Sequence, residues 1–350
     1  MHAHVLSRIQ ELGDLGLAPV LCLSAEQHGI VLAAADELED VAREMAAICT
    51  EHLGLSTVVL ECSQGTHLDH FRESLLIESY DDDDPPESRY RSALGQHHLT
   101  SRDLALDQRR VADVVIAKNL NRADYQVQIQ ALELIHRKRI YTRTAMHSTS
   151  KNFLLIALNE AGSELSMNSH LNDTFAISHY HVSSGYTSDA ASFRSQSSGA
   201  SFYSVLRSKE PISRSHSFNG ERLGPEVISH LRQALSRITM TAEVSAYLQN
   251  VVVAMRLHRY VAGGISALAT RHLRMIAKAM AVLHSLDFVT PAIVALAVRK
   301  VYYHRLKLAD EHTERSLRWG GDPLAVQQEM QHVDVELAMD AVISTVQSPL

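Results

Sequence analysis

The segment VADVVIAKNLNRADYQVQIQALELIHRKR, residues 111–139, joins a short apolar run to a longer amphipathic pattern. Its first part, Val114–Ala117, is continuously apolar, as in strands that a parallel sheet buries on both faces. Its second part, Tyr125–Arg139, has its apolar residues at helical spacing. A buried strand that leads through a few polar residues into a helix is typical of α/β domains. The segment therefore predicts a central sheet covered by helices.

The rest of the chain first extends this alternation and then becomes helical. Strand-like apolar runs occur at residues 19–34, 55–63 and 152–160, and residues 36–53 have helical spacing with an acidic first turn. After Pro225 the pattern predicts four helices: Val227–Arg237, Thr241–Tyr260, Thr270–Leu286 and Pro291–His304. We therefore predict the α/β fold class, with a three-layer core around a parallel sheet and an all-α lid domain after it.

Four regions follow from these changes of pattern: a core at 1–182, a Ser-rich insertion at 183–224, a helical lid at 225–308 and a helical tail at 309–350. The insertion has no sustained apolar period, so it cannot bury enough surface to offset its ordering entropy, and we predict that it is disordered. Inside the core, the acidic, proline-containing run 81–87 is predicted to be an exposed loop. Metal binding by its four aspartates is the alternative.

Composition argues against several classes of protein. The chain has 350 residues, 45% of them hydrophobic, and a net charge of −7, which argues against a general nucleic-acid binder. Three cysteines, Cys22, Cys49 and Cys62, are few and odd in number, which indicates a reducing compartment. We find neither a secretory leader nor an apolar run of membrane length. We expect a cytoplasmic protein, with the nucleus as the alternative, and no membrane partner.

Three stretches of the chain together resemble one family. IAKNLNRADYQVQIQALELIHRKRIYTR resembles the segment of magnesium-chelatase ATPase subunits and MoxR-like AAA+ proteins in which a strand ends in Asp-Glu and a helix follows. KNFLLIALNE stands where the family has its next strand, and SALATRHLRMIAKAMAVLHSLDFVTPAIVALAVRKVYYHRL is similar to the family's lid. The resemblance covers roughly residues 15–180 and 225–308. It implies a P-loop-type AAA+ core, assembly with AAA+ subunits, and ATP with Mg²⁺ as cofactors.

The first departure from this family lies at the phosphate-binding loop. Such a loop needs glycine N–H groups that face the phosphates, a lysine for their charge and a hydroxyl for Mg²⁺. At that position, residues 29–46 read GIVLAAADELEDVAREMA, with no Lys, Ser or Thr and no glycine after Gly29. Acids are present instead, among them Asp36, Glu37, Glu39 and Asp40. Because their negative charge repels a triphosphate, we expect poor anion binding there.

Two further catalytic elements are replaced. Lys118 and Asn119 stand in place of the Asp-Glu pair that holds Mg²⁺ and polarises water. Lys118 could supply a phosphate contact, but no carboxylate is left for the metal, since Asp113 lies at the other end of the strand. In HLNDTF, residues 170–175, Thr174 replaces the family's trans-acting arginine. We therefore assign no catalytic residue.

Three residues stand at positions that have a function in the family that the chain resembles. Asn159 stands at the sensor-1 position and Arg271 at the sensor-2 position, so both are candidate nucleotide-binding residues. Arg122 is placed to touch a neighbouring subunit and is a candidate interface residue. Each also has a structural alternative. Asn159 could cap the loop after its strand, Arg271 could be a solvated helix charge, and Arg122 could form a helix-entry hydrogen bond.

Histidine is frequent, with 21 residues, and close pairs occur at His2/His4, His97/His98 and His179/His181. The last pair would share one face of a strand and could point at one metal ion. Because no Cys or carboxylate set accompanies it at zinc-site spacing, we assign no metal site. The chain also lacks the Gly-x-Ser-x-Gly and His-Glu-x-x-His motifs, so a hydrolase reading has no support.

These observations predict a magnesium-chelatase/MoxR-like AAA+ protein that acts as a non-hydrolysing interaction or regulatory subunit. We expect it to form homo- or hetero-oligomers with AAA+ subunits, to bind no nucleic acid, and to bind ATP and Mg²⁺ weakly or not at all. The alternative is an active chelatase-type ATPase subunit that couples hydrolysis to Mg²⁺ insertion into protoporphyrin. The family's degenerate subunit carries an Asp-x-Ser-x-Ser metal-binding motif, which does not occur here. A histidine-based metal-binding module is a third possibility.

Overall fold

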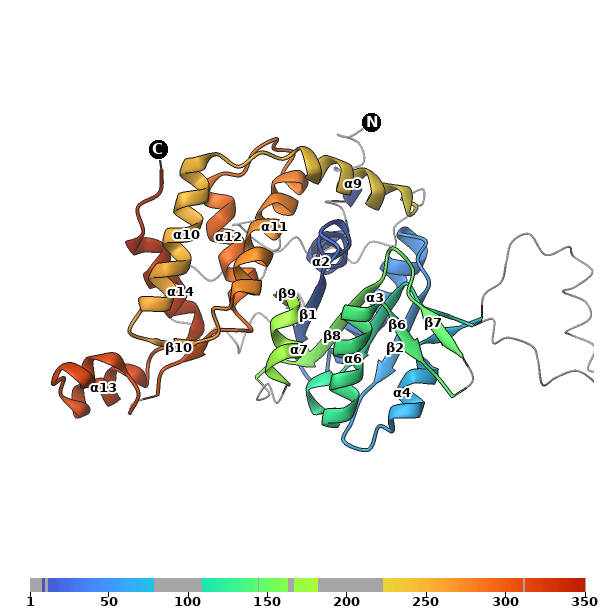
Figure 1. Cartoon of the computed structure of the whole chain (residues 1–350), viewed down its shortest axis with the longest axis horizontal. Coiled ribbons are helices and arrows are strands. Elements are labelled where there is room, and N and C mark those ends of the chain that lie inside the picture. Colours follow the sequence, from blue (N-terminus) through green and yellow to red (C-terminus); the bar gives the residue numbers. More distant parts are fainter. Residues whose placement is uncertain are drawn as a thin grey trace, which may run out of the picture.

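The computed structural model describes residues 8–9, 12–78, 109–143, 145–162, 167–181, 223–310 and 312–349 (Figure 1). The acidic run 81–87 and residues 183–222 of the Ser-rich insertion lie outside the described residues. The predictions made for these two segments therefore stay predictions. The described ranges form an α/β core joined to a group of helices.

A five-stranded sheet forms the centre of the core. Its strands are all parallel and lie in the order β2-β5-β8-β1-β9. Their bounds are Thr57–Glu61 (β2), Val114–Lys118 (β5), Leu154–Glu160 (β8), His28–Ala33 (β1) and Phe175–Tyr180 (β9). The connection from β1 runs towards β2, whereas the connection from β8 crosses to β9, so the chain changes direction between β1 and β8. Ligands of α/β sheets bind at such a point, outside the carboxyl ends of the strands.

Helices cover both faces of this sheet because strand residues alternate between two apolar clusters. In β5, Ile116 belongs to one cluster and its neighbour Val115 to the other. The first cluster includes helices α2 and α3, and the second includes α4 and α6. These helices span Gly13–Ser24, Leu38–Ala47, Leu68–Ser74 and Tyr125–Arg137. The core is therefore the three-layer arrangement that the sequence predicted.

Four helices form the lid: α9 (Glu226–Arg237), α10 (Ala242–Leu257), α11 (Ala267–Leu283) and α12 (Pro291–Tyr302). Thr241, Ser266 and Thr290 cap the last three, because each hydroxyl accepts a hydrogen bond from the backbone N–H three residues on. Each helix begins and ends within three residues of its predicted bounds, which confirms the all-α lid.

The chain continues past α12 into α13 (Pro323–Met330) and α14 (Val335–Thr345). Helix α13 extends away from the rest of the molecule in Figure 1. Helix α14 returns to pack on α10 and α12, and it buries Ala338, Met339 and Val342 in the first apolar cluster. The last helix therefore contributes to the core of the lid.

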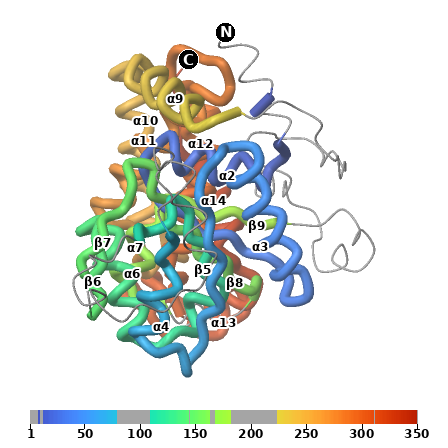
Figure 2. Tube along the Cα trace, turned by 90° about the vertical axis from the view of Figure 1, so that its right-hand side faces the viewer, coloured from blue at the N-terminus to red at the C-terminus, as the bar shows by residue number. Residues whose placement is uncertain are grey.

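The apolar run at residues 19–34 is not one strand, contrary to the prediction. Residues 19–24 belong to α2, and only His28–Ala33 forms a strand. Figures 1 and 2 show α2 between the sheet and the lid helices, and all residues from Leu15 to Ser24 are buried. A helix that is buried on every side has no polar face, so its sequence periodicity does not distinguish it from a buried strand.

Two global properties bear on function. Within the described residues, no helix combines the length and the apolarity needed to cross a bilayer. The three cysteines are free and buried. Burial raises the pKa of the Cys49 and Cys62 thiols to about 12 and also raises that of Cys22, so none is a reactive thiolate.

Candidate functional site

The turn between β1 and α3 occupies the position of a phosphate-binding loop. It consists only of residues 34–37, since β1 ends at Ala33 and α3 begins at Leu38. Gly29 lies inside β1 instead, where a Cβ atom would come within 2.9 Å of Cys22 Sγ. This glycine therefore serves the close packing of α2 on the sheet.

The amino terminus of α3 faces acids of its own chain. Glu39 and Asp40 lie in the first turn of α3, where the helix dipole favours negative charge. A phosphate group at a helix N-terminus uses the same dipole and the same N–H groups. Together with the missing lysine and hydroxyl, these carboxylates show that the turn does not fit a triphosphate with Mg²⁺.

Lys118, the last residue of β5, lies between two carboxylates from other elements. Its Nζ atom is 2.5 Å from Glu39 Oε2 of α3 and 2.8 Å from Glu61 Oε2 at the end of β2. The Lys118 side chain is only 14% exposed. The hydrogen bonds to Glu39 and Glu61 raise the pKa of the Lys118 ammonium, and the bond to Lys118 lowers the pKa of Glu39. These three residues, the Lys118 triad, form an ion cluster at the carboxyl ends of β2 and β5.

The Lys118 triad reverses the charges of a nucleotide site. A P-loop site has its lysine at the start of the first helix and its acids at the end of the third strand in chain order. Here the acid Glu39 is on that helix and Lys118 ends that strand. The two elements therefore attract each other directly through this ion pair.

Two asparagines lie near the triad. Asn119 is in the left-handed region, with φ 53°, which Asn tolerates better than most residues, and its Nδ2 donates to Glu61 at 3.0 Å. Asn159 pairs with Leu32 in the sheet and is fully buried. Within the described ranges, neither amide atom of Asn159 has a hydrogen-bond partner. Its side chain can therefore accept a polar ligand or a water molecule without breaking an existing bond.

Arg122, the candidate interface residue, lies in the 3₁₀ turn Leu120–Arg122 that follows β5. Its guanidinium pairs with Glu160 at the end of β8. The Arg122 side chain is nevertheless 53% exposed. The residue is thus accessible at the surface, and its role at an interface stays a prediction.

Arg271, the candidate sensor-2 residue, lies in the second turn of α11 and is exposed. It lines an open groove of about 460 Å³ on the lid. The groove residues are Gln249, Arg256, Ala267, Thr270, Arg271 and Arg274. Asn159 is not among them, so this groove does not bring the two candidate nucleotide-binding residues together.

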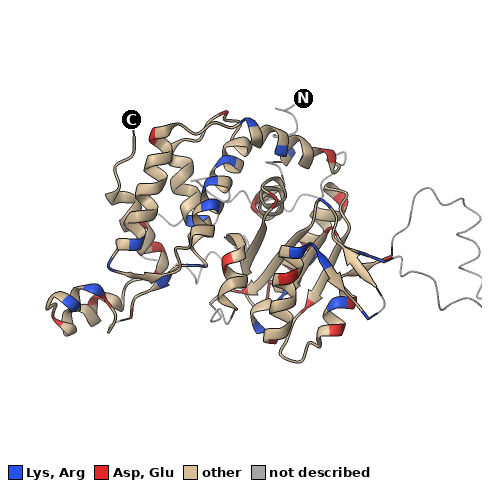
Figure 3. Cartoon of the chain, in the orientation of Figure 1, with Lys and Arg blue, Asp and Glu red and all other residues tan. Residues whose placement is uncertain are grey.

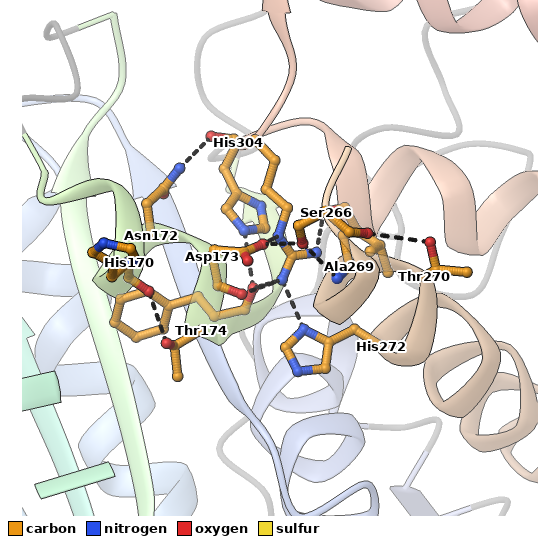
Figure 4. Close-up of polar contacts among 12 residues, drawn as sticks. His170, Asn172, Asp173, Thr174, Ser266, Ala269, Thr270, His272 and His304 are labelled. Carbon is orange, nitrogen blue, oxygen red and sulfur yellow. Dashed lines mark hydrogen bonds and ion pairs between the residues drawn. The ribbon is translucent and has the colours of Figure 1, made fainter. Parts of the chain in front are cut away.

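Thr174, at the position of the family's trans-acting arginine, lies at the junction between core and lid (Figure 4). It ends the short helix α7 (Ser169–Thr174) and is buried. Its hydroxyl donates to the carbonyl of His170 at 2.8 Å. A side chain that is buried in its own subunit cannot act on a neighbouring one.

The same junction contains a buried ion pair between core and lid. Arg305, which follows α12, is 1% exposed, and its Nε lies 3.3 Å from Asp173 Oδ1 of α7. Arg305 Nη2 also donates to the carbonyl oxygens of Asp173 and Phe175. Ser266, the cap of α11, donates its hydroxyl to Asp173 Oδ1 at 2.7 Å. The segment that carries Thr174 is thus fixed to the lid of the same chain (Figure 4).

Buried histidines complete this junction. His272 Nδ1 accepts a hydrogen bond from Arg305 Nη2, and His304 Nε2 bonds the carbonyl of Phe175 at 2.9 Å. Burial, and then the charge of Arg305, lower the pKa of His272 to about 3 and that of His304 well below its usual value. Both rings are therefore neutral at pH 7, which suits their bonds to the Arg305 cation and to a carbonyl oxygen.

The histidine pair 179/181 gives no metal site in the described residues. His179 is buried in β9, and burial lowers its pKa well below the usual value. In the part of the chain that the structure describes, no three His, Cys, Asp or Glu side chains are placed to hold one metal ion. The pairs His2/His4 and His97/His98 lie outside the described residues.

Comparisons with known proteins agree with this architecture. Residues 253–319 match the family model of the AAA lid domain. The crystal structure of "a putative ATPase" from Cytophaga hutchinsonii is similar over 100% of this chain and 97% of its own, with a TM-score of 0.64 and 14% identity. An MCM homolog from Methanopyrus kandleri aligns over 84% of this chain and 56% of its own, with a TM-score of 0.44 and 12% identity. Comparison with curated proteins gives no significant sequence match.

The lid match and the shared fold define the class: this chain has the architecture of an AAA+ protein, an α/β core followed by an α lid. At the carboxyl ends of β2 and β5, this architecture has the Lys118 triad. Sequence analysis found Lys118 and Glu39 but not their contact. It missed Glu61, Asp173 and Arg305 altogether, since only folding brings these residues to their partners.

Proposed function

We propose that this chain is a magnesium-chelatase/MoxR-like AAA+ protein that acts as a non-hydrolysing interaction or regulatory subunit. The observation that carries the proposal is the Lys118 triad. The ammonium of Lys118 stands where hydrolysis needs a carboxylate, and the carboxylate of Glu39 stands where binding needs a cation. The partners are identical or related AAA+ subunits, and regulation of such a partner is the role that a non-hydrolysing copy can play.

Binding of ATP with Mg²⁺ would have to break the triad. Mg²⁺ takes oxygen ligands, and the nearest strand-end carboxylate, Glu61, is already paired with Lys118. A triphosphate beside α3 would also meet Glu39 and Asp40 at short range. We therefore expect nucleotide affinity to be weak and insensitive to Mg²⁺.

An ATPase assay on the purified chain, with excess ATP and Mg²⁺, tests this proposal. We expect turnover below about 0.1 s⁻¹, well under typical enzyme rates. Equilibrium binding of ATP should not change when Mg²⁺ is removed. A contaminating ATPase would give the same rate in the wild type and in Arg271→Ala. Faster turnover that Arg271→Ala abolishes would overturn the proposal and favour the active chelatase-type subunit.

A further inference from the structure

The groove on the lid is lined by three arginines for which the described part of the chain contains no acidic partner. Arg256, Arg271 and Arg274 are all exposed. In the described part of the chain, Arg256 and Arg274 donate hydrogen bonds to neutral groups: Arg256 to the carbonyl of Ile265, and Arg274 to the hydroxyl of Ser245. None of the three forms an ion pair with a described residue. Figure 3 shows several Lys and Arg positions, in blue, along the ribbon of α11.

The positive charge of this groove contrasts with the negative net charge of the whole chain. The net charge is −7, so three unpaired cations in one groove are a local exception. The Ser245–Arg274 bond of 2.9 Å joins the two helices that flank the groove and holds one arginine in place. The groove has no aromatic side chain on which a base could stack, which favours an acidic peptide over a single-stranded nucleic acid.

The sequence contains one segment with the complementary charge. Residues 81–87 read DDDDPPE, with five carboxylates in seven positions. We propose that the groove formed by Arg256, Arg271 and Arg274 binds the acidic run 81–87 of a second copy of this chain. Its two prolines have a fixed φ, so the run loses less conformational entropy on binding than a chain of the same length without proline.

The place where the chain leaves the described core, shortly before the acidic run, favours a contact between copies over one within a copy. The chain leaves the described core after β3 (Leu76–Ile77) and returns at β4 (Arg110–Val111), which pairs with β3 and contacts β7 (Met146–Ser148). In Figure 1, β7 lies towards one end of the longest axis and α10 towards the other. A head-to-tail contact, in which one copy supplies the acids and the next the groove, joins these two ends.

Sedimentation velocity of the full-length chain tests the contact. The acid variant changes Asp81–Asp84 to Asn, and the groove variant combines Arg271→Glu with Arg274→Glu. Each should weaken self-association at least about tenfold, because several ion pairs are lost or reversed. The control variant combines Lys151→Glu with Arg237→Glu, two exposed cations outside the groove, and should associate like the wild type. Equal urea midpoints for all variants verify folding.

A mixing experiment separates the contact between copies from a contact within one copy. The acid variant keeps an intact groove, and the groove variant keeps its acids, so an equimolar mixture should form the heterodimer that neither forms alone. Higher salt should weaken this dimer, since the groove is exposed. The mixing experiment measures association and not turnover. Its result therefore does not depend on the result of the ATPase assay.

Three outcomes would overturn the proposal. The first is a wild-type chain that stays monomeric at about 100 µM. The second is association that is equal in all variants, or a mixture that behaves as two monomers. The third is binding of a single-stranded oligonucleotide that the groove variant loses while self-association is unchanged, since the groove would then belong to a nucleic acid.

Discussion

Lys118 shows how one side chain can replace a ligand at the edge of a sheet. In a nucleotide site, the first helix and the third strand are held by phosphate and metal, whereas here an ammonium and two carboxylates hold them. Because Lys118 is mostly buried and both acids are more than half exposed, water still screens part of each interaction. The triad is therefore a local clamp of modest strength.

The substitution Lys118→Met tests this clamp. It keeps most of the side-chain volume and removes the charge, so we expect the free energy of unfolding to fall by about 1 kcal/mol at pH 7. Urea denaturation measures the change, and Lys151→Met is the matched control because Lys151 is an exposed lysine that forms no ion pair with a described residue. A double-mutant cycle with Glu39→Gln should show positive coupling. Equal effects of the two lysine substitutions would contradict the clamp.

The pH dependence of the clamp follows from the two pKa directions. The raised pKa of Lys118 means that its contribution is fully present below the usual value of 10.5 and is lost as pH rises above it. The lowered pKa of Glu39 means that its contribution is present above 4.5 and is lost as pH falls further. The difference between wild type and Lys118→Met should therefore be flat near neutral pH.

Separation along the chain decides which of these residues sequence analysis could find. The helix starts at Thr241, Ser266 and Thr290 were predictable, because each cap acts on a residue three positions away. The bond from Lys118 to Glu39 spans 79 residues, and that from Arg305 to the Asp173 carbonyl spans 132. No periodicity or local motif encodes such pairs, so they emerge only from the fold.

At the scale of elements, Arg305 connects α12 of the lid with α7 of the core. Its guanidinium bonds the Asp173 carboxylate and three carbonyl oxygens, those of Asp173, Phe175 and Val301. Burial lowers the pKa of Arg305 to about 10, with Asp173 opposing the shift, so the residue is charged at pH 7. Gly264, with φ +96°, packs so closely on Arg305 that a Cβ atom would lie 1.9 Å from its carbonyl oxygen.

Arg305→Met should loosen this junction. The substitution leaves Asp173 and several carbonyl oxygens without their buried donor, and we expect a loss of about 3 kcal/mol in the free energy of unfolding. Arg274→Met, on the exposed face of α11, is the control and should change stability by less than about 0.5 kcal/mol. Urea midpoints give both values. A loss no larger than that of the control would show that the junction is held by apolar packing alone.

Helix α14 gives a second test at this scale. Met339 is 1% exposed and lies in the apolar cluster that core and lid share, whereas Leu337 on the same helix is 44% exposed. We expect Met339→Ala to cost about 2–5 kcal/mol and Leu337→Ala less than about 1 kcal/mol, measured by thermal and urea unfolding. Similar values for the two variants would mean that α14 does not contribute to the lid core.

At the scale of the whole molecule, one apolar cluster extends from the sheet through α2 into the lid helices. Neutral histidines are buried beside it. His28 Nδ1 accepts a hydrogen bond from the backbone N–H of Leu155 at 3.0 Å, which requires an unprotonated nitrogen. Burial, followed by nearby Lys138, lowers the pKa of His28 to about 3. Together with His272, His304 and His179, it couples folding to pH.

We expect this coupling to make the protein unusually sensitive to acid. Below the unfolded pKa of 6.5, each of these histidines binds a proton in the unfolded chain but not in the folded one, so stability falls as pH falls. By pH 5, His28 and His272 each account for about 2 kcal/mol of lost stability, and the lowered pKa of His304 and of His179 acts in the same direction. Carboxylates such as Glu39 lose their contribution only below about 4.5, so the histidines act first.

Urea midpoints measured at about pH 7, 6 and 5 separate the loss of stability caused by histidine protonation from the loss that carboxylate protonation causes at lower pH. The wild type should lose most of its stability across this range. His28→Gln can still accept the bond from Leu155 but binds no proton, so its stability should fall less steeply with pH. His170→Gln, at an exposed histidine, is the matched control and should keep the wild-type slope. If His28→Gln also kept the wild-type slope, the inference that His28 stays unprotonated in the folded protein would be wrong. Its Nδ1 could then not accept the bond from the Leu155 N–H.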